Sequence, residues 1–63
     1  MNILMITLTN ERGEEFLLNA FLIERILPNK YRGGSEIILS NGNHILCIES
    51  MDNVNLAIDM AKV

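Results

Sequence analysis

Ser35-Glu36-Ile37-Ile38-Leu39-Ser40-Asn41-Gly42-Asn43-His44-Ile45-Leu46-Cys47 is the stretch that decides the fold. Two runs rich in branched apolar residues flank Asn41-Gly42, which is the strongest hairpin-turn signal in the chain. We therefore predict two antiparallel strands, at residues 35–39 and 43–49.

The register of this hairpin depends on its turn. A two-residue turn would pair Ile37 with Leu46 and would place His44 on the apolar face. A three-residue turn, with Gly42 in the left-handed conformation, would pair Ile37 with Ile45. We favour the three-residue turn because it turns His44 outward and directs one apolar set inward: Ile37, Leu39, Ile45 and Cys47.

Upstream of the hairpin, alternating apolar residues predict three more strands, at residues 1–9, 15–19 and 23–27. A polar turn containing Gly13 joins the first two strands into a hairpin. Asn19 is a plausible cap for one helical turn before the third strand, which Pro28 ends.

Downstream of the hairpin, Ser50 is a typical N-cap for an amphipathic helix. Apolar residues recur at the spacing of one helical face, which we expect to cover the sheet: Val54, Ala57, Ile58 and Ala61. The predicted fold is α+β, a single domain over residues 1–63: a small antiparallel β-sheet or half-barrel of about five strands with one C-terminal amphipathic helix.

The chain is too short for a large core. A domain of 63 residues buries only about 60% of its unfolded surface, so its stability is expected to be marginal. A single cysteine, Cys47, excludes an internal disulfide, and a single histidine, His44, argues against a metal cage. Of the usual aids to a small fold, self-association remains.

The charge and hydropathy pattern exclude several classes of partner. A net charge of −3 with only five basic residues disfavours nucleic-acid binding, which requires phosphate neutralisation. No run approaches the roughly 18 apolar residues of a membrane span, and residues 1–8 lack the basic flank of a signal peptide. We expect a cytoplasmic protein with Cys47 reduced.

Apolar residues exceed what one small sheet and one helix can cover. One set lies on the outer sheet face in the favoured register, and a second stripe lies on the helix beside its core face. These residues form the predicted surface for self-association or for a partner protein: Ile3, Met5, Leu17, Ile38, Leu46, Ile48, Leu56, Met60 and Val63. A homo-oligomer is predicted, with a dimer the commonest case.

No group of residues predicts catalysis, a cofactor or a metal. His44 and Cys47 are separated by an odd number of positions along a strand, so their side chains should point to opposite faces and form no dyad. One loop combines basic and aromatic character and is a candidate site for an anion or a partner: Lys30, Tyr31, Arg32, Gly33 and Gly34.

From residue 13 onward the sequence resembles the FlbD family of small flagellum-associated proteins. The resemblance rests on a set of matching positions: Gly13, Phe16, Leu18-Asn19-Ala20, Leu22-Ile23-Glu24, Ile26, Ile37, Leu39, Asn41-Gly42, Glu49-Ser50 and Val54. It implies the same small fold and a role in motility.

Two functional hypotheses follow. The first is a non-enzymatic, self-associating interaction module that resembles a small motility or regulatory accessory protein. The second is a small antagonist of the kind carried by phages or mobile elements, which blocks a host protein or sequesters a small anionic ligand between subunits.

Overall fold

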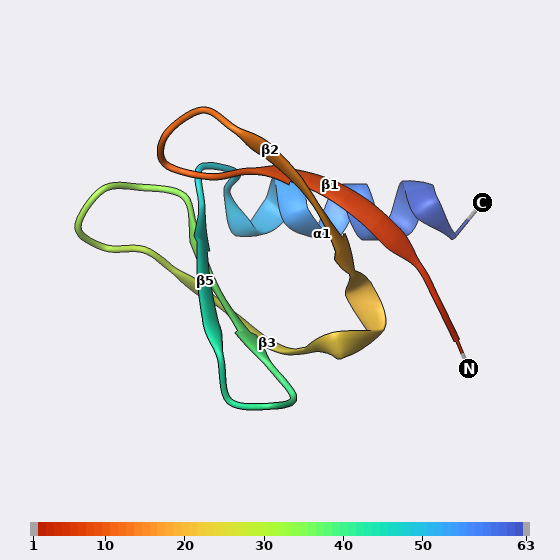
Figure 1. Ribbon diagram of the computed structural model, residues 1–63. Coiled ribbons are helices and arrows are strands. Elements are labelled where there is room, and N and C mark those ends of the chain that lie inside the picture. Colours follow the sequence, from red (N-terminus) through yellow and green to blue (C-terminus); the bar gives the residue numbers. More distant parts are fainter. Residues whose placement is uncertain (1, 63) are drawn as a thin grey trace.

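A computed structural model describes residues 2–62 and confirms the α+β class (Figure 1). The elements, in chain order, are β1 (Met5–Thr9), β2 (Glu15–Asn19), the 3₁₀ helix η1 (Ala20–Leu22), β3 (Ile23–Pro28), β4 (Ser35–Leu39), β5 (His44–Cys47) and α1 (Met51–Ala61).

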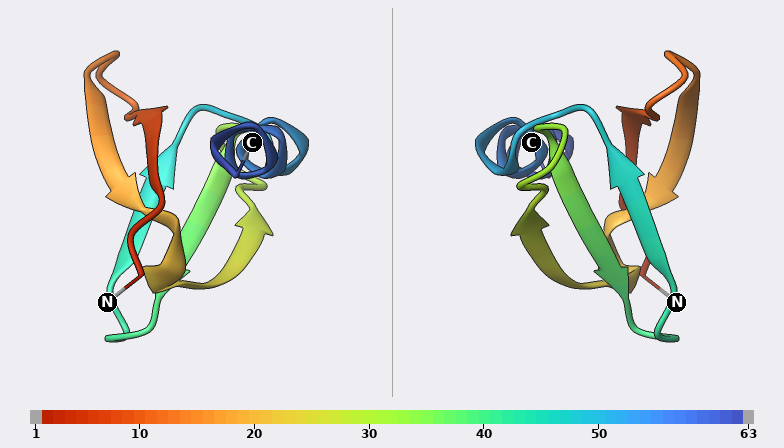
Figure 2. Two further views of the ribbon diagram at one scale, coloured as in Figure 1. Left: turned by 90° about the vertical axis from the view of Figure 1, so that its right-hand side faces the viewer. Right: turned by 90° about the vertical axis from the view of Figure 1, so that its left-hand side faces the viewer.

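The five strands form two antiparallel sheets instead of one continuous sheet. β1 pairs with β2, and the second sheet has the order β3-β4-β5. One backbone hydrogen bond links the sheets, in which the Ile48 N–H donates to the Thr9 carbonyl at 2.9 Å. A second one, from the Ser40 N–H to the Leu22 carbonyl at 2.8 Å, ties η1 to the end of β4. The strands therefore curve around a common interior (Figure 2).

The predicted register of the second hairpin is confirmed. Ile37 pairs with Ile45, and Gly42 adopts a φ of +90°. The Asn41 side chain accepts the Asn43 N–H at 2.9 Å, which closes the turn locally. His44 is exposed on the outer face, as the three-residue turn requires.

An asparagine lies at or near the start of each connection between successive strands of the two sheets. In every case its side-chain oxygen accepts the backbone N–H two residues later, a local bond that starts the turn. The acceptors are the side chains of Asn10, Asn19, Asn29 and Asn41, and the donors are the N–H groups of Arg12, Phe21, Tyr31 and Asn43, respectively.

The core lies between the two sheets and α1. Its buried apolar members are Ile6, Leu8, Leu18, Ile37, Leu39, Cys47 and Val54. The predicted helix face is confirmed, since Val54 is fully buried and Ala57, Ile58 and Ala61 pack against the core. The predicted cap is also confirmed, because the Ser50 hydroxyl accepts the Asn53 N–H at 3.2 Å.

Two predicted strands are too long. β1 begins at Met5, because the Leu4 N–H donates to the Asn19 side chain instead of to a strand partner. Met1 lies outside the described residues. β5 ends at Cys47, because the chain turns at Ile48 to reach β1 before it enters the helix.

α1 spans 11 residues, and across residues 2–62 no helix has the length and apolar character to cross a membrane.

Candidate functional site

The structure places most of the predicted contact residues on the surface. Seven of them are exposed: Ile3, Met5, Leu17, Leu46, Ile48, Leu56 and Met60. Ile38 is half-buried, and Val63 lies outside the described residues. The exposed residues do not form one face, so their positions decide which of them can act together.

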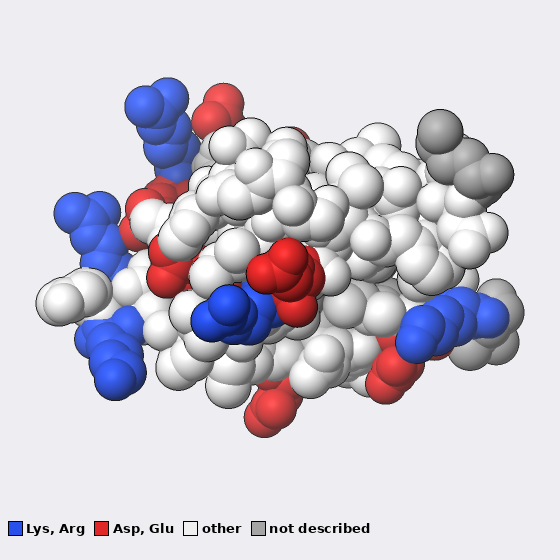
Figure 3. Space-filling model, turned by 90° about the horizontal axis from the view of Figure 1, so that it is seen from below, with Lys and Arg blue, Asp and Glu red and all other residues white. Residues whose placement is uncertain are grey.

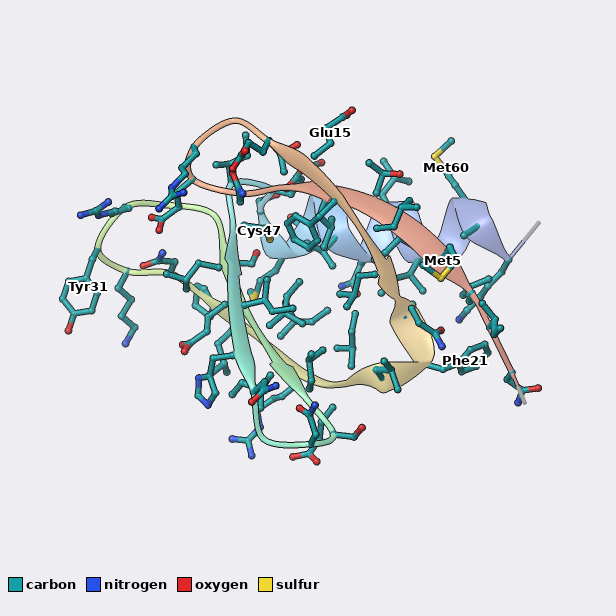
Figure 4. The ribbon with its side chains drawn as sticks, viewed as in Figure 1. Met5, Glu15, Phe21, Tyr31, Cys47 and Met60 are labelled. Carbon is teal, nitrogen blue, oxygen red and sulfur yellow. The ribbon has the colours of Figure 1, made fainter. Side chains whose placement is uncertain are left out.

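One group lies at the end of the molecule that holds the N-terminal end of β1, η1 and the C-terminal end of α1. Figure 4 shows Met5, Phe21 and Met60 projecting from three different elements at this end of the molecule. We call this group the terminal-end patch and define it by five residues that are between 45% and 67% exposed: Ile3, Met5, Phe21, Leu22 and Met60.

Hydrogen bonds fix the strand side of the terminal-end patch. The Ala20 N–H donates to the Leu4 carbonyl at 2.8 Å, and the Leu4 N–H donates to the Asn19 side chain at 3.1 Å. These bonds hold the segment between Ile3 and Met5 directly beside η1. The backbone on both sides of this junction is therefore held in place.

Sequence reasoning missed Phe21 and Leu22 as contact residues because it assigned them to a turn. Both lie in η1, where none of the three residues is buried. The available signal was the pair of large apolar residues in a helical turn too short to bury either side chain.

The outer face of the β3-β4-β5 sheet is more polar than the sequence predicts. Ile38 lies on the central strand between Arg25 and His44, which pair with it from either side and partly cover it. His44 Nδ1 contacts Oε2 of Glu36 at 2.6 Å on the same face. Leu46 is exposed beside Glu36, so this face has no continuous apolar surface.

The loop from Lys30 to Gly34 lies at the opposite end from the terminal-end patch. Tyr31 is 96% exposed, and Lys and Arg side chains gather at this end (Figures 3 and 4). Arg32 Nη1 lies 3.7 Å from Oε2 of Glu11 on the first hairpin turn. Shallow hollows of about 450 Å³ and 320 Å³ flank Tyr31.

Two backbone amides of this loop are already engaged. The Tyr31 N–H donates to the Asn29 side chain at 3.2 Å, and the Gly33 N–H donates to the Asn29 carbonyl at 3.1 Å. An anion cradle needs convergent free amides, and these two are not free. Gly34, with a φ of +78°, lies so close to Cys47 that a β-carbon would be 2.2 Å from its carbonyl oxygen.

Cys47 and His44 do not form a catalytic pair. Cys47 is 1% exposed in the core, whereas His44 lies on the outer face, as predicted. The Cys47 thiol donates to the Glu49 carbonyl at 3.8 Å. Burial raises the pKa of the Cys47 thiol, and the negative charge of Glu49 raises it further, so the thiolate is disfavoured.

Across residues 2–62, no three His, Cys, Asp or Glu side chains converge to hold a metal ion.

Glu49 holds the junction of the two sheets, a role that the sequence did not reveal. Its carboxylate accepts the Thr9 N–H at 3.0 Å, and its backbone carbonyl accepts the Ser35 hydroxyl at 2.7 Å. Ser50, the next residue, caps α1. The Glu49-Ser50 pair therefore fixes the point where β5, β1 and α1 meet.

Comparison with protein families gives a match over most of the chain. The model of the FlbD family, described as flagellar and swarming motility proteins, matches residues 5–62. The chain belongs to the FlbD family. Several positions that suggested the resemblance build the FlbD scaffold: Asn19 at η1, Asn41-Gly42 at the hairpin turn, and Glu49-Ser50 at the junction.

Comparison with curated proteins found no match, and comparison with solved structures found none either.

Proposed function

We propose that this FlbD-family protein is a non-enzymatic accessory of flagellar and swarming motility that acts in the cytoplasm by binding proteins, including itself. The observation that carries the proposal is the terminal-end patch, in which five large apolar side chains from three parts of the chain remain exposed. Exposed apolar groups of this kind usually mark an interaction site.

The energetic argument favours association. Burial of one large apolar side chain contributes roughly 1.5 to 3 kcal/mol. The total stability of a 63-residue chain is only about 3 to 9 kcal/mol at typical values per residue. Covering even part of the terminal-end patch would therefore stabilise the protein by an amount comparable with its own folding free energy.

The family match favours the motility hypothesis over the antagonist hypothesis, because it supplies a cellular context for an interaction module. The opposite end of the molecule offers a second contact of different character. There Tyr31 projects beside Lys30 and Arg32, a combination suited to an acidic protein surface.

A complementation experiment tests the proposal. A strain that lacks the gene receives one of two matched double variants, and its swarming is measured. The test variant carries Met5→Asp and Met60→Asp, and the control carries Thr7→Asp and Asn55→Asp. Both variants alter the outer side of β1 and exposed positions of α1, and both add two negative charges. Only the control variant leaves the terminal-end patch intact.

We expect the control to restore swarming and the patch variant to fail, with both proteins folded by circular dichroism. Full swarming with the folded patch variant would contradict the proposed function.

A further inference from the structure

The outer edge of β2 is the strand edge best suited to accept another strand. The Asn10 N–H bonds the Glu14 carbonyl, and the Ala20 N–H bonds the Leu4 carbonyl. Along a strand of an antiparallel pair, residues whose backbone groups point toward the partner alternate with residues whose groups point away. The N–H and C=O of Phe16 and Leu18 therefore point toward β1. The N–H and C=O of Glu15 and Leu17 therefore point away from β1, as does the N–H of Asn19.

These outward groups are unpaired within the part of the chain that the structure describes. β2 has β1 as its sole strand neighbour there, and no backbone hydrogen bond joins Glu15 or Leu17 to another element. Figure 2 shows β2 at the margin of the molecule, on the side away from α1.

Features of two other strand edges make them less suited to accept a strand. β3 carries a bulge between Ile23 and Arg25 and ends in Pro28, two features that block the addition of a strand. β5 leads into Ile48, whose N–H already bonds Thr9 of β1. β2 has neither a proline nor a bulge.

We propose that a second copy of this chain pairs with β2 antiparallel, about a two-fold axis at Leu17. The pairing gives a four-stranded sheet of order β1-β2-β2-β1. It gives self-association an interface separate from the terminal-end patch, and it rests on the self-association proposed above. Isologous contacts of this kind generate closed dimers, the commonest homo-oligomers.

The choice of register follows from hydrogen bonding and charge. An axis at Leu17 places Leu17 opposite its own copy and Glu15 opposite Asn19, so all three outward residues of β2 find partners. An axis at Glu15 would set two carboxylates directly opposite each other, which is unfavourable. An axis at Phe16 or Leu18 would leave one outward residue without a partner in β2.

The side chains fit the same register. Leu17 is 67% exposed on the outer face of the β1-β2 hairpin, where nothing in residues 2–62 explains a large apolar side chain. Across the axis it meets an identical leucine, which converts two exposed side chains into one apolar contact. Glu15 meets the amide of Asn19, a pair without charge repulsion.

Disulfide trapping tests both the edge and the register. In the proposed dimer the two Leu17 α-carbons form a hydrogen-bonded pair about 5.5 Å apart, within the range that a disulfide spans. Thr7 lies opposite Leu17 on β1, so two Thr7 residues would be three strand spacings, about 14 Å, apart. Leu17→Cys should form a cross-linked dimer under mild oxidation, and Thr7→Cys should not.

Neither variant requires a change in the core, because both native side chains are exposed. The wild type controls for Cys47, which is buried. Equal cross-linking of both variants, or of neither, would overturn the proposed pairing.

The solution mass of the Leu17→Lys variant distinguishes a failure of the β2 interface from a failure of the proposed function. A charge at the axis should reduce the dimer to monomers of 7.1 kDa. A dimer that persists in Leu17→Lys would overturn the β2 interface and leave self-association standing. A wild type that is monomeric at every concentration would overturn both.

Discussion

The Glu49 carboxylate accepts the backbone N–H of Thr9 at 3.0 Å, across 40 positions of the chain. Next to this bond, the Ile48 N–H donates to the Thr9 carbonyl at 2.9 Å. Thr9 therefore has both backbone groups satisfied by the segment that joins β5 to α1. The two sheets are connected at this residue, through one backbone hydrogen bond and one hydrogen bond to a side chain.

Glu49→Ala should lower the free energy of unfolding by about 1 to 2 kcal/mol, because the half-buried Thr9 N–H loses a charge-assisted acceptor. Glu49→Gln is the matched control, since it keeps an oxygen at the same reach and should lose less than half of that amount. Urea unfolding followed by circular dichroism measures both. Equal stability of Glu49→Ala and wild type would show that the bond is not important.

Gly34 should be far less replaceable than its neighbour Gly33. Both have positive φ, which strains any other residue by about 1 to 2 kcal/mol. A β-carbon on Gly34 would also meet the Cys47 carbonyl oxygen at 2.2 Å, whereas one on Gly33 meets nothing within 4 Å. Gly33→Ala should cost about 1 to 2 kcal/mol and Gly34→Ala about 2 to 5 kcal/mol.

Thermal unfolding of the two alanine variants gives the comparison directly. A melting temperature for Gly34→Ala equal to or above that of Gly33→Ala would contradict the close packing of Gly34 on β5.

The stability of the protein should fall in alkaline solution because of Cys47. Burial raises the pKa of its thiol above the unfolded value, so the folded state holds this proton more tightly than the unfolded chain does. The stabilisation is complete below the unfolded pKa, about 8.5, and is lost as the pH rises from there through the folded pKa.

Unfolding free energies at pH 7.5 and pH 10, for wild type and Cys47→Ala, isolate this effect. The decrease between the two pH values should be larger for the wild type, since other titrating groups are common to both proteins. An equal decrease would mean that the thiol titrates alike in the folded and unfolded states.

Amide hydrogen exchange should distinguish the two edges of β2. The Phe16 and Leu18 amides face β1 and should exchange slowly at any protein concentration. The Leu17 amide faces outward, so it should exchange rapidly in dilute protein and slowly in concentrated protein. Concentration-independent exchange at Leu17 would contradict the pairing of β2 with a second copy.

Much of the fold could be predicted from local signals. Asn41-Gly42 and the alternation around it specified the register between Ile37 and Ile45, because a shift would have turned His44 inward. The cap at Ser50 and the periodicity from Val54 to Ala61 specified the helix and its buried face. These features depend on residues close together in the sequence.

The remainder depended on long-range contacts that no local pattern contains. The connection between the two sheets depends on the Thr9–Ile48 bond, and the need for glycine at position 34 results from the approach of Cys47. The candidate site shows the same limit. Met5 and Met60 were predicted as contact residues, but their grouping with Phe21 at one end required the path of the chain through η1.

The solution mass of the wild-type protein, measured by light scattering across a concentration series, tests the central claim most directly. Self-association predicts a mass that rises from the chain mass of 7.1 kDa toward twice that value as the concentration increases. A mass of 7.1 kDa at every concentration would contradict the claim that this protein is a self-associating module.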